Sequence, residues 1–575
     1  MNVSFLLPVY NTDKILLRIC INSILHTLED KHELIVVNDA SEKEETLDQL
    51  EKLRQLTKPN IVVVDNASNS GVSYSLNRAA GISSRPLLAP IDHDDLLMPG
   101  GFQDAMRYLK YYRSEWIYTD EIQIDHQGFL INNFFKPAYS KHLLRSLMYL
   151  NHLQIFSRDL FSRTGGYRIG FEGSQDHDLA LRMSEIAAPR HAPVLAYQWR
   201  IQTNTLSRVN SVPSPKVIER SSIAIREHLT RLGLDSTVTL AISTGSAYKI
   251  RLKAETTPKV SVIIPCKLGT QREINGVNHV LLEHCLQYLE RTTSDFRSNY
   301  SDNFEVVIVI NAEDDKSAAN GLLEHSSLAG KVVSDEPGFN FSRKCNLGAT
   351  HSNGNILVFL NDDTQFLTNN WLDTVISMLV EDDVACVGGL LLNADGSVQS
   401  CGDIVGHNAA NHYCPRKIPD TVGDPMHRYV VDHETTSITG AFLCCRSNTF
   451  ETLDGFNEEL PNSFQDVDFC LRSRRQGLRC ILSPEIKLFH FESSSREPTV
   501  DMETLSFFRH IHSDTIASPD LFQLWKYQPV HVKWFSLQGL IYARRRFPFI
   551  LRNVAREILR RIGKKPRARY KYLID

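Results

Sequence analysis

Two clusters of carboxylates each follow an apolar run of the chain. One ends the stretch Leu87–Asp95, and the other ends the stretch Ile356–Asp363. Crowded carboxylates repel one another and raise one another's pKa, and a bound divalent cation relieves that repulsion. Hard oxygen ligands favour Mg²⁺ or Mn²⁺, which also bind a substrate diphosphate. A single cluster is more often a solvated turn or a helix cap, but its recurrence favours a metal site with Asp94 and Asp363 as ligands.

A second pair of motifs reads Gln-Asp-x-Asp, followed by apolar residues and Leu-Arg. Asp176 and Asp466 are the first acids of these motifs, and Asp178 and Asp468 are the second. An aspartate before an amphipathic helix is often only a helix cap. A carboxylate beside a sugar hydroxyl can instead accept its proton as the hydroxyl attacks an anomeric carbon. We expect Asp176 and Asp466 to be general bases, and the second acids to cap the helix or support the base.

One histidine lies in a polar stretch towards the end of the second half. His490 is followed by a glutamate, three serines and Arg496. A lone histidine is usually structural, but this grouping is typical of a loop that binds a diphosphate or a metal ion. We expect His490 to be a metal ligand and Arg496 to face phosphate oxygens. The first half has a looser counterpart at Tyr197–Arg208, which lacks the histidine.

A further acid, Asp39, ends an apolar strand. Its carboxylate could accept a hydrogen bond from a nucleotide base, although the following Ala-Ser makes a simple turn nearly as plausible. The corresponding stretch of the second half begins at Asn311, and the alignment there is uncertain by one residue.

The chain repeats these motifs in the same order, which indicates two copies of one unit. The copies share an apolar strand ending in proline, a second apolar strand, a helix start containing asparagine, the carboxylate cluster and the Gln-Asp-x-Asp motif. The first three pairs are Val3–Pro8 with Val260–Pro265, Leu34–Asp39 with Glu305–Asn311, and Ser73–Ala80 with Phe341–Ala349. Five ordered blocks are too many to agree by chance.

The apolar runs alternate with helical patterns, which predicts an α/β fold. We expect two tandem Rossmann-like domains, each with a mainly parallel sheet covered on both faces. Ligands of such sheets bind outside the carboxyl ends of the strands, where the acidic clusters fall. Proline-containing segments suggest a first domain at residues 1–255, a second at 256–500, and a helical, basic extension at 501–575.

The composition is that of an ordinary soluble globular protein, with 42% hydrophobic and 23% charged residues among 575. The net charge of −4 gives no global indication of nucleic-acid binding. The short apolar N-terminus lacks a basic flank, so we expect a strand rather than a signal peptide. No apolar run approaches the roughly 20 residues of a membrane span. The 11 cysteines, without CxxC spacing, suggest buried thiols in a reducing, cytoplasmic compartment.

From Arg544 the chain becomes strongly basic, with apolar residues at near-helical spacing between the charges. A basic amphipathic helix is typical of a segment that lies on an anionic membrane. The alternative is a solvated or disordered tail. We expect this segment to attach the protein peripherally at the cytoplasmic face of the inner membrane.

Together these blocks resemble the family 2 glycosyltransferases, which have the GT-A fold. In that family the strand-Pro-x-Tyr-Asn start holds the nucleotide, and here it reads Pro8, Tyr10 and Asn11. The family's Asp-x-Asp matches Asp92 and Asp94, so the resemblance implies that Asp92 also contacts the donor. The family's acidic base motif matches the Gln-Asp of both copies, with glutamine in place of the usual glutamate.

The second copy departs from the family pattern at two further places. Pro265 is followed by Cys-Lys, and Asn361 replaces the first aspartate, which leaves Asp362 as the middle residue and Asp363 as the expected ligand. The resemblance implies that Pro265, Asn311 and Asp362 contact the donor.

The second copy most resembles the bacterial rhamnosyltransferase-like enzymes of O-antigen and cell-surface polysaccharide synthesis. The motifs that carry this resemblance are Asp395–Gly402, Thr439–Leu443, Gly455–Asn457, Phe464–Arg472 and His490–Arg496. It implies an inverting, metal-dependent hexosyltransferase that uses nucleotide-diphosphate sugars and a glycan or lipid-linked acceptor.

Two complete copies would make the enzyme bifunctional. The alternative is that one copy catalyses transfer while the other binds glycan or nucleotide, or acts as a scaffold. A nucleotidyltransferase or a dinucleotide-dependent dehydrogenase is disfavoured, because each needs a glycine-rich loop after the first strand.

Overall fold

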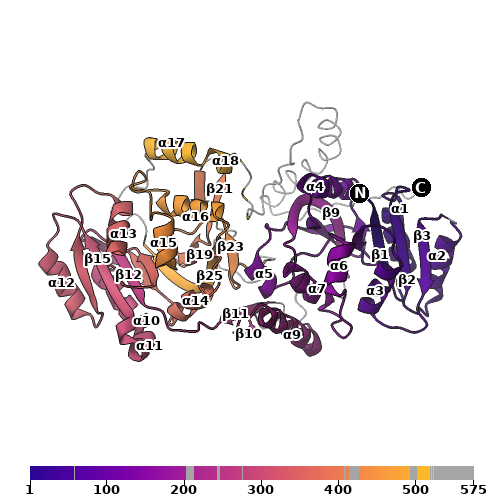
Figure 1. The fold of residues 1–575 in the computed structure, drawn as a ribbon, viewed down its shortest axis with the longest axis horizontal. Helices are drawn as coiled ribbons and strands as arrows, with labels where there is room; N and C mark the ends of the chain where they lie inside the picture. The colour runs from indigo at the N-terminus through magenta and orange to yellow at the C-terminus, as the bar shows by residue number, and fades with distance from the viewer. Residues whose placement is uncertain are drawn as a thin grey trace. The chain divides into compact units, whose positions relative to one another are not determined.

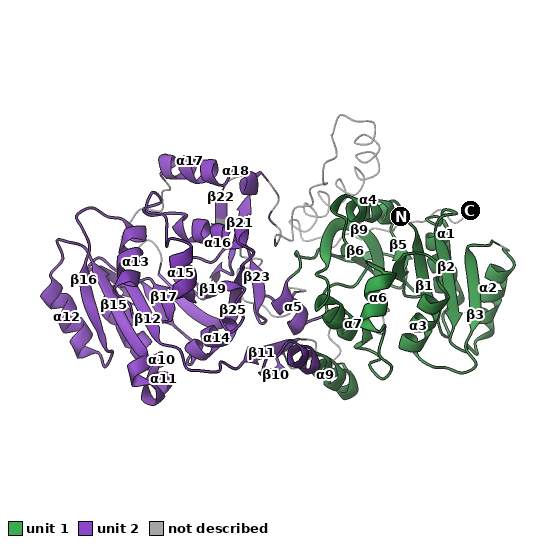
Figure 2. Ribbon diagram, viewed as in Figure 1, with its two compact units in different colours: residues 1–139, 148–224, 524–575 green, residues 140–147, 225–523 purple. Residues whose placement is uncertain are grey.

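The chain forms two compact α/β units in a computed structural model (Figures 1 and 2). The structure describes residues 1–56, 58–201, 213–242, 247–274, 276–406, 409–412, 426–491, 501–517, 520 and 522. The described part of the first unit contains Met1–Tyr139 and Met148–Ala224, and the second unit contains Ser140–Leu147 and Ile225–Gln523. The domain limits at residues 255 and 500 stay predictions.

The first unit alternates strands and helices along most of its length. Its elements are β1 (Val3–Val9), α1 (Lys14–Leu25), β2 (Glu33–Asn38), α2 (Glu44–Arg54), β3 (Ile61–Asp65), α3 (Val72–Ile82), β4 (Leu87–Pro90), β5 (Leu96–Leu97), α4 (Gly101–Tyr112), β6 (Trp116–Ile124), β7 (Leu130–Phe134), β8 (Gln154–Ser157), α6 (Arg158–Thr164), α7 (Gln175–Ser184), β9 (Arg190–Arg200) and the first part of α9 (Pro215–Arg231).

The second unit repeats this alternation, with additional hairpins. Its elements are α5 (Lys141–Ser146), β10 (Ser236–Leu240), β11 (Tyr248–Leu252), β12 (Val260–Pro265), β13 (Gln271–Ile274), β14 (Val277–Val280), α10 (Leu281–Thr292), α11 (Ser294–Asn299), β15 (Phe304–Ile310), α12 (Lys316–His325), β16 (Gly330–Ser334), α13 (Phe341–Thr350), β17 (Ile356–Leu360), β18 (Thr364–Phe366), α14 (Trp371–Met378), β19 (Val384–Leu392), β20 (Val398–Ser400), β21 (Asp403–Gly406), β22 (Ala409–His412), β23 (His433–Thr435), β24 (Phe442–Arg446), α15 (Ser447–Thr452), α16 (Gln465–Arg475), β25 (Arg479–His490), α17 (Met502–Ile511) and α18 (Ser513–Ile516).

The two main sheets have the same strand order. The first runs β3-β2-β1-β4-β8-β6-β9-β5, and the second runs β16-β15-β12-β17-β24-β19-β25-β18. In each, the first four strands are parallel, as expected. Each sheet is mainly parallel, as expected, but one reversed strand interrupts it: β8 is antiparallel to β4 and β6, and β24 is antiparallel to β17 and β19. Beyond this strand the parallel direction returns, because β9 is parallel to β6 and β25 is parallel to β19. An antiparallel strand begins where its neighbour ends, so the residues just before β8 and β24 lie at the carboxyl ends of β4 and β17.

The strand registers fix the alignment of the two copies. Val3 pairs with Leu87 in the first sheet, and Val260 pairs with Ile356 in the second. The residue after Val3 or Val260 is a serine whose hydroxyl donates a hydrogen bond of 2.6 Å to a glutamate of the next strand in both units. Through this register Asp39 is equivalent to Asn311, which removes the uncertainty of one residue.

Two clusters of buried side chains pack against the second sheet. Adjacent residues of a strand point to opposite faces, so Cys444 packs into one core cluster and Cys445 into the other. All ten cysteines among the described residues are buried and free. No helix of the described residues is both long enough and apolar enough to cross a membrane.

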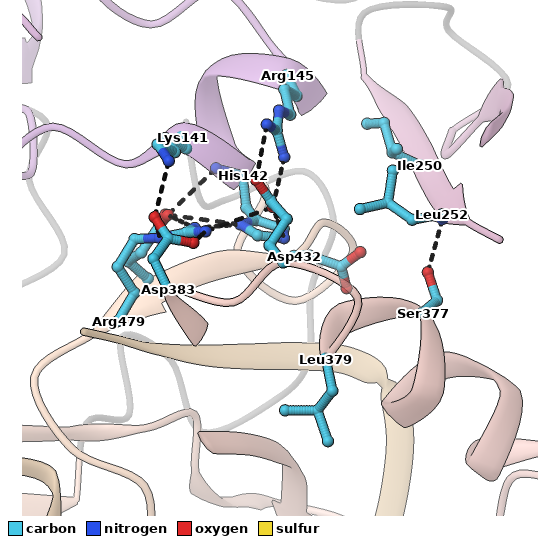
Figure 3. Close-up of polar contacts among 12 residues, drawn as sticks. Lys141, His142, Arg145, Ile250, Leu252, Ser377, Leu379, Asp383, Asp432 and Arg479 are labelled. Carbon is cyan, nitrogen blue, oxygen red and sulfur yellow. Dashed lines mark hydrogen bonds and ion pairs between the residues drawn. The ribbon is translucent and has the colours of Figure 1, made fainter. Parts of the chain in front are cut away.

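A short segment between β7 and β8 belongs to the second unit. Helix α5 lies on that unit through ion pairs of Lys141 with Asp383, at 2.8 Å, and of Arg145 with Glu381, at 2.7 Å (Figure 3). Nδ1 of His142 accepts a hydrogen bond of 2.9 Å from the guanidinium of Arg479. The residues that follow α5 return to the first unit at Met148.

Candidate active sites of the two repeats

The first candidate site lies at the carboxyl end of β4. Asp92 is exposed over 53% of its side chain, whereas Asp95 is 1% exposed. The backbone N–H of Arg200 donates to one Asp95 oxygen at 2.7 Å, and the other is a buried oxygen without a hydrogen-bond partner among the described residues. Desolvation, followed by the charge of Asp92, raises the pKa of Asp95 well above its ordinary value. The carbonyl oxygen of Asp94 accepts from Arg200 Nε at 2.9 Å.

A histidine that the sequence did not single out completes this cluster. Nε2 of His152 lies 3.3 Å from Asp92, and Nδ1 lies 3.4 Å from Glu121. Its ring stacks on Tyr197, with centroids 4.9 Å apart. Burial disfavours the charged imidazole, but the two carboxylates outweigh burial and raise the pKa of His152. Ligand atoms of Asp92, Asp95 and His152 lie within 4.8 Å of one another, which makes these three residues a candidate metal site.

Asp176 lies beside this cluster, in the first turn of α7. Its carboxylate accepts a hydrogen bond of 2.9 Å from Gln175 and a further one from the side chain of Asn151. Desolvation, followed by the charge of Asp92, raises the pKa of Asp176 to about 6. The structure therefore brings Asp92 and Asp176 together, and Asn151 and His152 join them because β8 begins at this edge.

The second candidate site lies at the carboxyl end of β17. His490 Nε2 is 3.2 Å from Oδ1 of Asp363, which is 9% exposed. Nδ1 of the same ring lies 2.7 Å from the amide oxygen of Gln399, so Nδ1 donates and leaves the Nε2 lone pair towards Asp363. Oδ1 of Asp363 and Oδ1 of Asn361 are buried oxygens without a hydrogen-bond partner in the described part of the chain. Two such oxygens beside an imidazole nitrogen fit a divalent cation.

Asp362 interacts with the carboxylate of Asp363 and with a buried lysine. Desolvation, followed by the charge of Asp363, raises the pKa of Asp362 to about 8. Lys344, which is 1% exposed, donates a hydrogen bond of 2.7 Å to the carbonyl of Cys266 and interacts electrostatically with Asp362. The sequence analysis missed Lys344, because only the fold brings helix α13 beside the end of β12.

Asp466 occupies the place in the second unit that Asp176 has in the first. The backbone N–H groups of Gly440 and Val467 donate to its two oxygens at 2.5 and 2.9 Å. The registers of β24 and β8 make Gly440 equivalent to Asn151. In both units, therefore, the residue that donates to the aspartate lies just before the equivalent strand. Desolvation, followed by the charge of Asp403, raises the pKa of Asp466.

The second acids of the Gln-Asp-x-Asp motifs are buried in ion pairs. Asp178 pairs with Arg182 at 2.5 Å, and Asp468 pairs with Arg472 at 2.8 Å. Both arginines also donate to backbone carbonyls of the loop that precedes their helix. These acids therefore hold the helix that carries Asp176 or Asp466 against its own loop.

The residues expected to hold the nucleotide of the first unit stabilise neighbouring loops. Asn11 accepts hydrogen bonds from the backbone N–H groups of Glu42 and Lys43 at 2.8 and 3.0 Å. Asp39 is 4% exposed, and its carboxylate accepts hydrogen bonds from Asn66 and from two backbone N–H groups of the loop that follows β3. Pro8 is buried within β1, whereas Tyr10 is 43% exposed after the end of β1.

In the second unit, Pro265 is buried at the end of β12 and Asn311 follows β15. The backbone N–H of Asn311 donates to Asp314 at 2.9 Å, and the same carboxylate accepts from Leu268. Both positions therefore belong to the expected sheet edge. Arg496 and the basic stretch from Arg544 lie outside the described residues.

Comparison with known proteins gives related sequences over most of the chain. An uncharacterised protein of Sinorhizobium fredii is 30% identical, over 86% of this chain and 53% of its own length. The O-antigen biosynthesis protein RfbC of Myxococcus xanthus is 29% identical, over 86% of this chain and 38% of its own length. The chain therefore spans about half or less of these relatives. Among solved structures, S. aureus TarS in complex with UDP-GlcNAc is 18% identical with a TM-score of 0.34, over 40% of this chain and 66% of that one.

The model of the family described as glycosyl transferase family 2 matches residues 4–161 and 282–424, which together are more than half of the chain. One segment falls in each repeat. The matched segments include the carboxylate clusters that end β4 and β17. The chain therefore belongs to glycosyl transferase family 2, with one family segment in each of its two repeats.

Proposed function

We propose that the chain is a bifunctional, inverting glycosyltransferase, in which each repeat transfers a sugar from a nucleotide-diphosphate donor. The observation that carries this proposal is the recurrence of one constellation. Each repeat has a half-buried aspartate with a raised pKa, Asp176 or Asp466, and a carboxylate paired with an imidazole, which is Asp92 with His152 or Asp363 with His490. Both constellations lie at the same edge of equivalent sheets. A repeat that only bound ligand would have no need of the base.

In the proposed reaction the acceptor hydroxyl oxygen forms a bond to the anomeric carbon while the bond from that carbon to the diphosphate oxygen breaks. The hydroxyl proton passes to Asp176 in the first repeat and to Asp466 in the second. The nucleoside diphosphate leaves with the bonding electron pair. A pKa raised by desolvation makes each carboxylate a better proton acceptor once it is ionised.

Each repeat also offers ligands for the expected Mg²⁺ or Mn²⁺. We propose that Asp363 and His490 hold the ion in the second repeat, with Gln399 fixing the tautomer of the imidazole. In the first repeat we propose Asp94 and His152 beside the carboxylate of Asp92. When bound, such an ion neutralises charge that develops on a departing diphosphate. The protein itself supplies the orientation of these ligands.

The acceptor that we propose is a growing cell-surface polysaccharide. Support comes from the name of the Myxococcus relative, an O-antigen biosynthesis protein, which aligns with most of this chain. We propose further that the acceptor is lipid-linked and that the basic stretch from Arg544 contacts the cytoplasmic face of the membrane. The test compares binding of the full chain and of a chain ending before Arg544 to anionic vesicles. If neither binds, the membrane proposal is wrong.

The test uses the full chain and a panel of UDP-, GDP- and dTDP-linked sugars, with product detected by mass spectrometry. Asp176→Asn and Asp466→Asn should each abolish a different transfer or donor hydrolysis. Exposed aspartates serve as matched controls: Asp159→Asn in the first unit and Asp302→Asn in the second. If only one of the two base variants changes any product, one repeat catalyses and the other binds or scaffolds.

A further inference from the structure

The segment after the second repeat packs against the helix that carries Asp466. Phe508 of α17 is completely buried and stacks on Phe464, with ring centroids 4.7 Å apart. Phe464 comes directly before the Gln-Asp of the base motif. Ile516 of α18 joins the same core cluster as Leu471 of α16. Residues that the sequence placed outside the second domain therefore form part of its core.

A buried histidine connects this segment to the base helix. His512 is 1% exposed, and its Nε2 lies 2.9 Å from Oδ1 of Asp468. The guanidinium of Arg475 donates to Nδ1 of the same ring at 3.0 Å. Because Nδ1 accepts, Nε2 carries hydrogen and donates to Asp468. Arg472 holds the other oxygen of Asp468 at 2.8 Å, so one carboxylate connects the segment to the first turn of α16.

An aspartate of the same segment holds the hairpin of β21 and β22. Asp520 accepts hydrogen bonds from the backbone N–H of Val405, at 2.7 Å, and from the hydroxyl of Thr436, at 2.9 Å. The hairpin begins at Asp403, which is 2% exposed and is the main charged neighbour that raises the pKa of Asp466. The segment therefore contacts both the helix that carries Asp466 and the strand that carries Asp403.

The first repeat fixes its base helix differently. Both oxygens of Asp178, the equivalent of Asp468, are occupied by arginines of the same repeat, Arg168 and Arg182. Helix α9 approaches the start of α7 through Val217 and Ser221: the hydroxyl of Ser174 donates to the carbonyl of Val217 at 3.0 Å and lies 2.8 Å from the hydroxyl of Ser221. A histidine contributed by a later helix is thus particular to the second repeat among the described residues.

We propose that Asp501–Ala517 together with Asp520 is a positioning element of the second active site, in which His512 and Asp520 set the carboxylate of Asp466. The inference rests on the proposed role of Asp466 as the base. The proposed metal ligands Asp363 and His490 are positioned by other strands: Asp363 lies between β17 and β18, and His490 ends β25. Loss of the positioning contacts should therefore slow transfer without weakening metal binding.

The test uses full-length variants. His512→Leu removes the donor to Asp468, His512→Gln keeps an N–H donor there, and Asp520→Ala releases the hairpin. Met502→Ala is the matched control, because Met502 lies on α17 and is 68% exposed. Hydrogen exchange of the backbone amides of Gln465–Arg475, kcat and donor KM of the second transfer, and Mn²⁺ affinity are measured for each variant.

We expect His512→Leu and Asp520→Ala to speed exchange at the start of α16 and to lower kcat by about 10-fold or more, the usual effect of losing a supporting contact. Donor KM and Mn²⁺ affinity should stay within about 2-fold of the unmodified protein, because the substitutions do not change the residues proposed to bind the donor and the ion. His512→Gln should recover most of kcat. Met502→Ala should match the unmodified protein throughout.

Normal kcat in His512→Leu and Asp520→Ala, or a loss of kcat that His512→Gln shares in full, would overturn the proposal. If His512→Leu fails to fold, the comparison of His512→Gln with Asp520→Ala decides in the same way. The exchange measurement needs no sugar donor. Faster exchange without any second transfer in the unmodified protein would therefore count against the proposed function, whereas unchanged exchange would count against the positioning element.

Discussion

The imidazole of His152 lies 3.3 Å from the carboxylate of Asp92, although the strand position that carries the site histidine of the second repeat is occupied by Trp199 in the first. The strand registers give this equivalence. Gln198 pairs with Leu96 of β5, just as Phe489 pairs with Gln365 of β18, so the next residues, Trp199 and His490, occupy the same position. The two repeats thus supply an imidazole to the same edge from different strands.

Replacement of either histidine should affect one transfer only. His152→Gln should lower the first transfer by about 10- to 100-fold, the range found when a metal site loses a ligand partner, and leave the second unchanged. His490→Gln should do the reverse. Each is measured with the full chain and the donor that its own repeat uses.

The matched control is His93→Ala. His93 follows Asp92 in sequence, but its ring forms a hydrogen bond of 3.0 Å with Thr12 and takes no part in the ion pair of Asp92 with His152. A first transfer that falls equally in His93→Ala and His152→Gln would show that the loss reflects local disturbance rather than a function of the imidazole.

The sequence predicted the recurring carboxylates correctly because each follows directly from a strand end. An apolar run that stops in Asp92 or Asp363 places its acid at the carboxyl edge whatever the rest of the chain does. The same local logic predicted two equivalent α/β units. It could not predict His152, because that residue reaches the site only through a strand that runs antiparallel to β4, and periodicity does not reveal strand direction.

The positioning role of residues beyond 500 was hidden for a related reason. The contact between His512 and Asp468 joins residues that are 44 positions apart, one in the turn between α17 and α18 and the other on α16. Either residue alone looks like an ordinary polar residue of a helix. The sequence separates the extension from the second domain by composition, whereas the core cluster of Phe508, Ile516 and Leu471 unites them.

The amide of Gln399 should control metal affinity in the second repeat. Gln399→Leu removes the acceptor for Nδ1 of His490 and frees the imidazole to adopt the other tautomer or another rotation. We expect Mn²⁺ affinity to fall by about 10- to 100-fold, measured by electron paramagnetic resonance of free Mn²⁺. Gln365→Leu is the control, since that amide bonds to His284 instead. Equal losses in the two variants would contradict this role.

The first transfer should depend on pH through Asp176. A general base acts in its ionised form, and the pKa of Asp176 is raised to about 6 by desolvation and by the charge of Asp92. We expect kcat to rise by about 10-fold per pH unit below that value and to level above it, since one ionisation controls the rate. The measurement is a pH profile under saturating donor and acceptor.

Two further variants each remove the negative charge beside one of the proposed bases, and their pH profiles are measured in the same way. Asp92→Asn should move the midpoint of the residual first transfer to lower pH, and Asp403→Asn should do the same for the second transfer, in which Asp403 raises the pKa of Asp466. Asp159→Asn, an exposed change in the first unit, should leave both midpoints in place. A midpoint that moves to higher pH in Asp92→Asn would contradict the electrostatic origin of the shift.

The network beneath helix α5 should set the acid stability of the second unit. Glu434 is 4% exposed, and Arg479 donates to it at 2.9 Å while His142 lies 3.5 Å away. Burial alone would raise the pKa of Glu434, but these partners outweigh burial and lower it from 4.5 to about 2. The stabilisation from Glu434 is therefore complete above pH 4.5, the unfolded value, and is lost as the pH falls towards 2.

Arg479→Met should test this network, because it removes the guanidinium that pairs with the buried Glu434 and with the partly exposed Asp383. Removal of one member of a buried ion pair costs about 3 to 5 kcal/mol, so the free energy of unfolding at neutral pH should fall by that order. The dependence on pH below 4.5 should also flatten, since the pKa of Glu434 is then no longer held low. Calorimetry at several pH values measures both effects. Arg163→Met, which breaks only exposed pairs with Glu115 and Asp159, should cost at most about 1 kcal/mol. If the two substitutions cost the same, the buried network contributes no more to stability than a surface ion pair.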